Sequence, residues 1–135
     1  MRVEHEVLLP DGWAPAVGYA NGVAAAAGRL VFIAGQVGWD AAQRFHSEDI
    51  APQFAQALEN VLAVLAKAGG RPEHICRMTA YCCDKPAYLA ARVELGGIWR
   101  RRMGRHYPAM SMVFVADLLD HPAKIELEAT AVVPT

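Results

Sequence analysis

The sequence is poor in cysteine, in charge of one sign and in long apolar runs, and each shortage excludes a class of protein. Its 135 residues include 3 cysteines, 13 basic residues and 14 acidic residues. The near balance of charge gives no global reason to expect nucleic acid or a membrane surface as a partner. The longest apolar stretch, from Val23 to Gly35, is broken at Gly28-Arg29 and is shorter than the roughly 20 residues that a membrane span needs.

The N-terminal residues do not have the pattern of a targeting segment. Charged residues alternate through Met1 to Glu6, and Pro10-Asp11-Gly12 follows where a signal peptide would carry its apolar region. We therefore expect a soluble, cytoplasmic protein with no membrane partner.

Metal and disulfide patterns are absent as well. Cys76, Cys82 and Cys83 form neither a CxxC pair nor a metal-ligand spacing with a histidine, and no two of the five histidines are neighbours in sequence. Adjacent cysteines on a strand point to opposite faces, so Cys82 and Cys83 should not bridge each other. We expect reduced thiols, no metal and no cofactor.

Apolar residues are plentiful, and their spacing predicts the elements of one domain spanning residues 1–135. A hydrophobic content of 54 % is enough for a core, and no repeat or linker divides the chain. Apolar residues recur every three or four positions from Ser47, expected as the cap, to Gly69-Gly70, which predicts a helix. Lys85-Pro86 opens a second helix that ends at Gly104. The expected strands are Val23–Ala27 and Leu30–Ala34, joined as a hairpin, then Ile75–Cys83, Met110–Ala116 and Lys124–Val133.

This order predicts an α+β fold in which two helices cover one face of a mixed sheet. The strands at Leu30–Ala34 and Met110–Ala116 are apolar on both sides. Because two helices cover only one face, the other face should be buried by further subunits.

Two acidic residues stand out in the last strand. Glu126 and Glu128 are two positions apart, so both carboxylates project from the face opposite to Ile125 and Leu127. A carboxylate on a face closed by apolar residues needs a partner and has a pKa open to perturbation, which makes the pair a candidate site. The alternative is that one or both pair with an Arg or Lys across an interface.

Four segments together resemble the RidA/YjgF family of enamine and imine deaminases, also called the endoribonuclease L-PSP family. They are Tyr19, Ala34-Gly35-Gln36, Pro108-Ala109-Met110-Ser111 and Ile125-Glu126-Leu127-Glu128-Ala129. The resemblance covers about Pro15 to Val133. It implies a chorismate mutase-like fold and a homotrimer with ligand clefts between subunits.

The resemblance also implies roles for individual residues. Glu126 matches the glutamate that orients the water attacking the imine carbon, and Tyr19 matches a tyrosine that lines the substrate pocket. The family's Arg, which holds the substrate carboxylate, is replaced by Met110. A thioether offers no donor to a carboxylate, whereas a guanidinium offers a planar fork of donors.

Three further positions depart from the family pattern. Ala34 replaces a serine beside Gly35, Arg92 replaces a pocket asparagine, and Met112 replaces a cysteine. A guanidinium from Arg92 or Arg105 is an alternative source of the missing positive charge.

The leading interpretation is a RidA-like protein that binds or hydrolyses a small metabolite that is not a free 2-imino acid, with hydrolysis directed at a C–N bond. The expected catalytic residue is Glu126, and the expected ligand-binding residues are Tyr19, Ala34, Gly35, Arg92, Met110 and Met112. One alternative is a non-catalytic metabolite-binding module. The other is RNA binding or cleavage through the basic cluster Arg100–Arg102, which the near-neutral charge does not favour.

Overall fold

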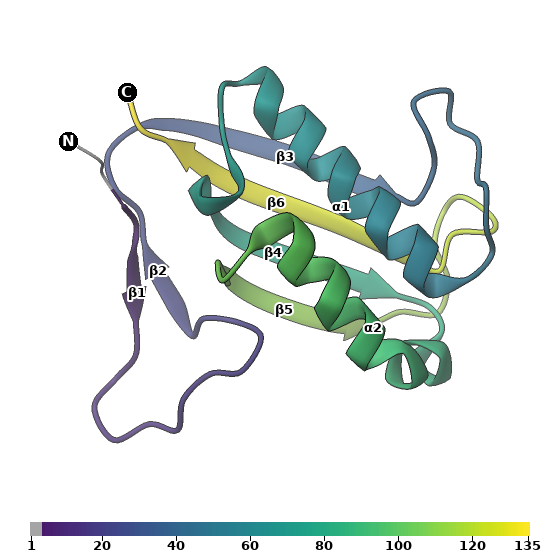
Figure 1. Cartoon of the computed structure of the whole chain (residues 1–135), viewed down its shortest axis with the longest axis horizontal. Helices are drawn as coiled ribbons and strands as arrows, with labels where there is room; N and C mark the ends of the chain where they lie inside the picture. Colours follow the sequence, from purple (N-terminus) through teal and green to yellow (C-terminus); the bar gives the residue numbers. More distant parts are fainter. Residues whose placement is uncertain (1–3) are drawn as a thin grey trace.

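The computed structural model describes residues 4–135, so Met1 to Val3 of the charged N-terminal segment lie outside the described residues. Figure 1 shows the elements in chain order. They are β1 (Glu6–Leu8), β2 (Gly22–Ala24), β3 (Arg29–Val37), α1 (Ile50–Lys67), the short 3-10 helix η1 (Pro72–His74), β4 (Ile75–Cys82), α2 (Lys85–Met103), β5 (Ala109–Phe114) and β6 (Ile125–Val133).

The main sheet is mixed, with the strand order β3-β6-β4-β5. β6 lies antiparallel to β3 and to β4, while β4 and β5 run parallel and are connected through α2. Both helices lie on one face of this sheet (Figure 1). The α+β architecture expected from the sequence is therefore confirmed.

The core lies between the helices and the sheet. On β6, Ile125, Leu127 and Ala131 are fully buried and Ala129 nearly so, whereas Glu126 and Glu128 alternate with them. Leu58 and Leu65 of α1 are fully buried against this face. The alternation places both carboxylates on the face away from the helices, as the sequence predicts.

The helix boundaries agree with the sequence except at the start of α1. Asp84 caps α2 by accepting a hydrogen bond from the Ala87 amide at 3.0 Å, and Gly104 ends the helix with a φ of 63°. Ser47 does not cap α1, because Asp49 holds the capping position and the Ser47 hydroxyl accepts from the Asp49 amide at 3.0 Å.

The predicted hairpin between Val23–Ala27 and Leu30–Ala34 is wrong. β2 pairs with β1, and β3 pairs along its length with β6. The two-stranded β1-β2 unit lies beside the main sheet (Figure 1). A β-branched run following a glycine marks a strand correctly, but its pairing partner depends on residues about 100 positions away, which local patterns do not specify.

The face away from the helices is less apolar than expected. Leu30 and Phe32 of β3 are 57 % and 74 % exposed on it. β4 and β6 contribute polar side chains to the same face, since Thr79 is paired with Glu128 and Tyr81 with Glu126. The exposed apolar surface of this face therefore lies at its two edges, on β3 and at Val113 of β5, and is interrupted at the centre of the sheet.

Gly96 and Gly97 of α2 are not required by close packing in the described chain, because a Cβ atom on either would meet no backbone atom from another element within 4 Å. A Cβ atom at Gly97 would meet only the flexible end of Arg101, at 3.5 Å. Glycine in a helix interior costs about 0.5–1 kcal/mol relative to alanine.

Gly97→Ala should therefore raise the free energy of unfolding by about 0.5–1 kcal/mol, measured by urea denaturation. Loss of stability in this variant would instead indicate that another subunit packs closely against α2 at this point.

Candidate functional site

Glu126 lies against the backbone of β3. A Cβ atom on Gly35 would lie only 2.8 Å from both Cδ and Oε2 of Glu126, so the carboxylate occupies the space that a side chain at position 35 would need. The register of β3 and β6 shifts between Ile33 and Gln36, which places Gly35 inside this irregularity. Ala34 lies beside it on the exposed part of β3. Glu126, Gly35 and Ala34 thus form one group.

The environment of Glu126 favours its protonated form. Desolvation is the largest cause that raises the pKa of this carboxyl above its ordinary value of 4.5, and the negative charges of Asp120 and Glu128 raise it further. A carboxylate whose pKa moves toward neutrality is better suited to accept and return a proton than an ordinary surface glutamate.

Glu128 has a partner within its own chain. The Tyr81 hydroxyl donates a hydrogen bond to Oε1 of Glu128 at 2.5 Å, and this bond is the main cause that raises the pKa of Tyr81. The pairing with an Arg or Lys that the sequence leaves open is therefore not required for Glu128. The carboxylate of Glu128 is held by this bond, whereas the side chain of Glu126 forms no hydrogen bond or ion pair with the described residues 4–135.

The other candidate residues gather on the opposite side of the sheet, in a cavity of about 420 Å³. We call it the helix-side cavity. It lies between α2, β5 and the loop before β2, and its polar or aromatic lining includes Tyr19, Tyr88, Arg92, Arg100 and Tyr107. Met110 and Met112 form its strand wall and also pack on the core.

One wall of the helix-side cavity is rigidly held. The Trp99 indole N–H donates to the carbonyl oxygen of His106 at 3.1 Å, and the Trp99 ring stacks on Tyr107 at a centroid distance of 6.1 Å with nearly parallel planes. Trp99 itself is buried, so the ring of Tyr107 in front of it offers the flat surface for an apolar or planar ligand.

A single chain does not bring Glu126 together with Tyr19 and Met110. Met110 is paired with Met78, which is fully buried under the helices, so Met110 faces the helices. Glu126 projects from the other face of the sheet. The two groups of candidate residues are separated by the sheet itself, and only a second subunit could place one group opposite the other.

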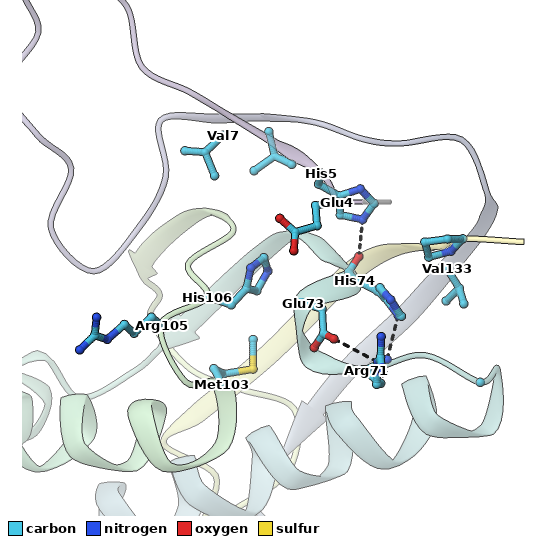
Figure 2. Close-up of a pocket in the computed structure, with 13 residues that line it drawn as sticks. Glu4, His5, Val7, Arg71, Glu73, His74, Met103, Arg105, His106 and Val133 are labelled. Carbon is cyan, nitrogen blue, oxygen red and sulfur yellow. Dashed lines mark hydrogen bonds and ion pairs between the residues drawn. The ribbon is translucent and has the colours of Figure 1, made fainter. Parts of the chain in front are cut away.

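Arg105 lies outside both groups. It lines a separate cavity of about 800 Å³ between the β1-β2 unit, η1 and the end of α2, shown in Figure 2, where its side chain extends away from the other labelled residues. Of the two arginines considered as replacements for the missing one, Arg92 therefore lies with Met110 and Arg105 does not.

The cavity in Figure 2 also brings together three histidines that the sequence keeps apart. Nδ1 of His5 accepts from the Ala26 amide at 2.9 Å, so Nε2 carries the proton and donates to the carbonyl oxygens of His74 and Val132, each at 3.1 Å. Nε2 of His106 donates to the carbonyl oxygen of Ile75 at 2.7 Å.

Most polar side chains of this second cavity thus form hydrogen bonds with backbone groups or ion pairs with neighbouring side chains. Arg71 pairs with Glu73 at 3.0 Å, and Nδ1 of His74 accepts from the Arg71 amide at 2.9 Å. The hydrogen bonds of His5 hold the N-terminal segment against η1 and β6, whereas the contacts of Arg71 lie within the turn that leads into η1. Spacing in the sequence does not indicate this cluster, because its histidines lie at positions 5, 74 and 106 and meet only in the folded chain.

The basic cluster at the end of α2 is divided rather than continuous. Arg100 lines the helix-side cavity, while Arg102 pairs with Glu59 of α1 at 3.3 Å. A continuous basic surface for RNA is therefore not formed by these three residues in the chain.

Within residues 4–135, no group of three or more His, Cys, Asp and Glu side chains is arranged to hold a metal ion. The three cysteines are free, with Cys82 buried. In the same described range, neither helix has the length and hydropathy needed to cross a membrane.

Comparison with known proteins agrees with the fold and the motifs. The family model described as endoribonuclease L-PSP matches residues 11–133. A RutC family protein of Haemophilus influenzae is 33 % identical over 78 % of this chain and 80 % of its own length. The 2-iminobutanoate/2-iminopropanoate deaminase of Salmonella typhimurium is 32 % identical over the same shares.

A solved structure extends the agreement to three dimensions. The YyfB protein of Yersinia pestis, described as a member of the conserved Rid protein family, has a TM-score of 0.86 and 32 % identity, covering 97 % of this chain and 100 % of its own. The chain therefore belongs to the endoribonuclease L-PSP family, which is also known as the RidA/YjgF family.

Proposed function

We propose that this protein binds a small metabolite in clefts between its subunits and hydrolyses a C=N bond there, with Glu126 as the catalytic residue. The observation that carries the proposal is the desolvated carboxylate of Glu126 lying against Gly35, beside the partnered Glu128. The relationship to an imine deaminase, 32 % identical over 78 % of the chain, supports the reaction class.

The proposed reaction needs only water and a proton carrier. Glu126 accepts a proton from water as the water oxygen forms a bond to the imine carbon, and the C=N electron pair moves to nitrogen, which is protonated. The resulting carbinolamine then loses ammonia, leaving a carbonyl product. The raised pKa of Glu126 favours both the uptake and the return of the proton.

The proposed cleft is built from two subunits. One subunit supplies the group of Ala34, Gly35 and Glu126, and its neighbour supplies Tyr19, Met110 and the rest of the helix-side cavity. The exposed Leu30 and Phe32 provide apolar surface that such an assembly would bury. We propose a homotrimer, in which each of three clefts is formed in the same way.

The substrate we propose is not a free 2-imino acid. The carboxylate of such a substrate is attached to the reacting carbon. The family binds this carboxylate with an arginine, and this chain has Met110 at the arginine's position. A charge-assisted hydrogen bond contributes about 1.5–3 kcal/mol, and Met110 offers none. For imines without that carboxylate, replacing the arginine by methionine removes no binding interaction.

Mixed oligomers test the two-subunit site. Glu126→Gln removes the proposed base, and Met110→Trp fills the cavity, so each variant alone should be inactive. The substrates are imines that an amine oxidase releases from simple amines, and semicarbazide trapping of the remaining imine measures the rate. Oligomers refolded from an equal mixture should recover about a quarter of the wild-type rate, because each cleft draws one group from each of two subunits at random.

Met112→Trp provides a second variant that blocks the same cavity, in case Met110→Trp does not fold, and circular dichroism checks folding of each. Absence of recovery in mixtures of folded, assembled variants would contradict a cleft shared between subunits. A wild-type chain that binds these imines without accelerating their hydrolysis would favour the non-catalytic binding module instead.

A further inference from the structure

The helix-side cavity holds two positive charges on one wall. Arg92, Gly96 and Arg100 are spaced four residues apart on α2, so they lie along one face of the helix, and all three line the cavity. Gly96 lies between the two arginines on this wall of the cavity. A Cβ atom there would lie 3.8 Å from Nη1 of Arg100, so the guanidinium of Arg100 folds back along the helix toward Arg92.

These two charges are not neutralised within the part of the chain that the structure describes. Three other arginines of this range, Arg44, Arg71 and Arg102, each pair with an aspartate or a glutamate. Arg92 and Arg100 have no hydrogen bond or ion pair with residues 4–135, and no described residue lining their cavity is acidic. Their donors remain available to an anion from outside the chain.

We propose that Arg92 and Arg100 form a subsite for the acidic end of a dianionic small metabolite, either a phosphomonoester or a dicarboxylate. Two guanidiniums offer two planar forks of donors, which match a group with two negative charges better than a single carboxylate. The ring of Tyr107, which stacks on the buried Trp99, lines the same cavity as Met110 and provides surface for the apolar part of the ligand.

This inference rests on the proposed function, because it takes the helix-side cavity as the ligand site. It adds to the proposed function a position for the negatively charged group of the ligand. The subsite is on the helix wall, whereas the family's arginine position is on the strand wall at Met110. A ligand held by Arg92 and Arg100 therefore carries its acidic group at a distance from the reacting carbon, unlike a 2-imino acid.

Matched probes with one aromatic ring test the subsite. Phenyl phosphate and phthalate carry two negative charges near pH 7.5, and benzoate carries one. Isothermal titration calorimetry on the wild-type protein should give dissociation constants for at least one dianion that are about tenfold lower than for benzoate. The tighter of the two dianions identifies the acidic group.

Arg92→Gln and Arg100→Gln should each weaken dianion binding by about ten- to a hundredfold, as expected for loss of a charge-assisted fork of hydrogen bonds. Arg101→Gln is the matched control, because it removes the same charge from the adjacent position of α2, which does not line the cavity. The dissociation constant of the Arg101→Gln variant for the dianion should stay within about twofold of the wild-type value.

Equal binding of benzoate and both dianions, absence of binding by all three probes, or an equal loss in Arg101→Gln would overturn the subsite. These results leave Glu126-dependent hydrolysis untouched, since that activity is measured on simple imines without an acidic group. Conversely, dianion binding that depends on Arg92 in a protein without hydrolytic activity would retain the subsite and remove the proposed reaction.

Discussion

Glu126→Gln should lower the rate of imine hydrolysis by about a hundred- to ten-thousandfold, the contribution typical of a positioned general acid or base. The amide keeps the shape of the side chain against Gly35 but cannot accept the proton of water. Rates with imines released by an amine oxidase, measured under single-turnover conditions, provide the test. Glu128→Gln is the matched control, because Glu128 is on the same strand and face but is bound by Tyr81.

The same substitution should stabilise the fold at neutral pH. Because desolvation raises the pKa of Glu126 in the folded state, protonated Glu126 is compatible with folding, and stability is lost as pH rises through that raised pKa. The gain from Glu126→Gln should therefore be present at pH 7 and disappear below the ordinary glutamate value of 4.5. Urea denaturation at both pH values measures it. An equal rate and a lower stability in this variant would indicate a structural role only.

The second large effect concerns 2-iminopropanoate. The wild-type protein should hydrolyse it at close to the uncatalysed rate, because Met110 cannot bind its carboxylate. Met110→Arg should raise the rate by about ten- to a hundredfold, which corresponds to one charge-assisted interaction. The double variant with Glu126→Gln should lose this gain. A wild-type rate comparable to that of an arginine-containing relative would contradict the proposed specificity.

Met112→Arg is the control for the added charge. Its side chain lies on the same strand and lines the same cavity two residues further along, so it adds a guanidinium without placing it at the family's position. It should give no comparable gain. An equal gain in both variants would show that overall positive charge, rather than the geometry at position 110, limits the reaction.

Much of the fold could be predicted because each element carries a local signal. The proline in the first turn and the glycine after the last turn define α2, and the strict alternation around Glu126 defines which side of β6 is buried. Family motifs identified the candidate residues. These signals depend on positions a few residues apart, which is the range over which helix and strand periodicity act.

The relative placement of the candidate residues could not be predicted in the same way. Alternation gives the face of Glu126 within β6, but the face of Met110 depends on how the edge strand β5 is aligned with β4. The presence of Arg100 in the cavity also depends on how its long side chain folds back over Gly96, which helix periodicity does not specify. The three histidines around the second cavity meet only through long-range packing.

The contact between Gly35 and Glu126 has a consequence for judging related sequences. The position of the acid is determined by a residue that has no side chain, so any replacement of Gly35 would move the carboxylate while leaving every ionisable residue unchanged. A relative with the complete Glu-x-Glu motif but with a larger residue at the position of Gly35 would have its acid displaced. Even alanine at position 35 would therefore leave Glu126 in the sequence while moving its carboxylate out of place.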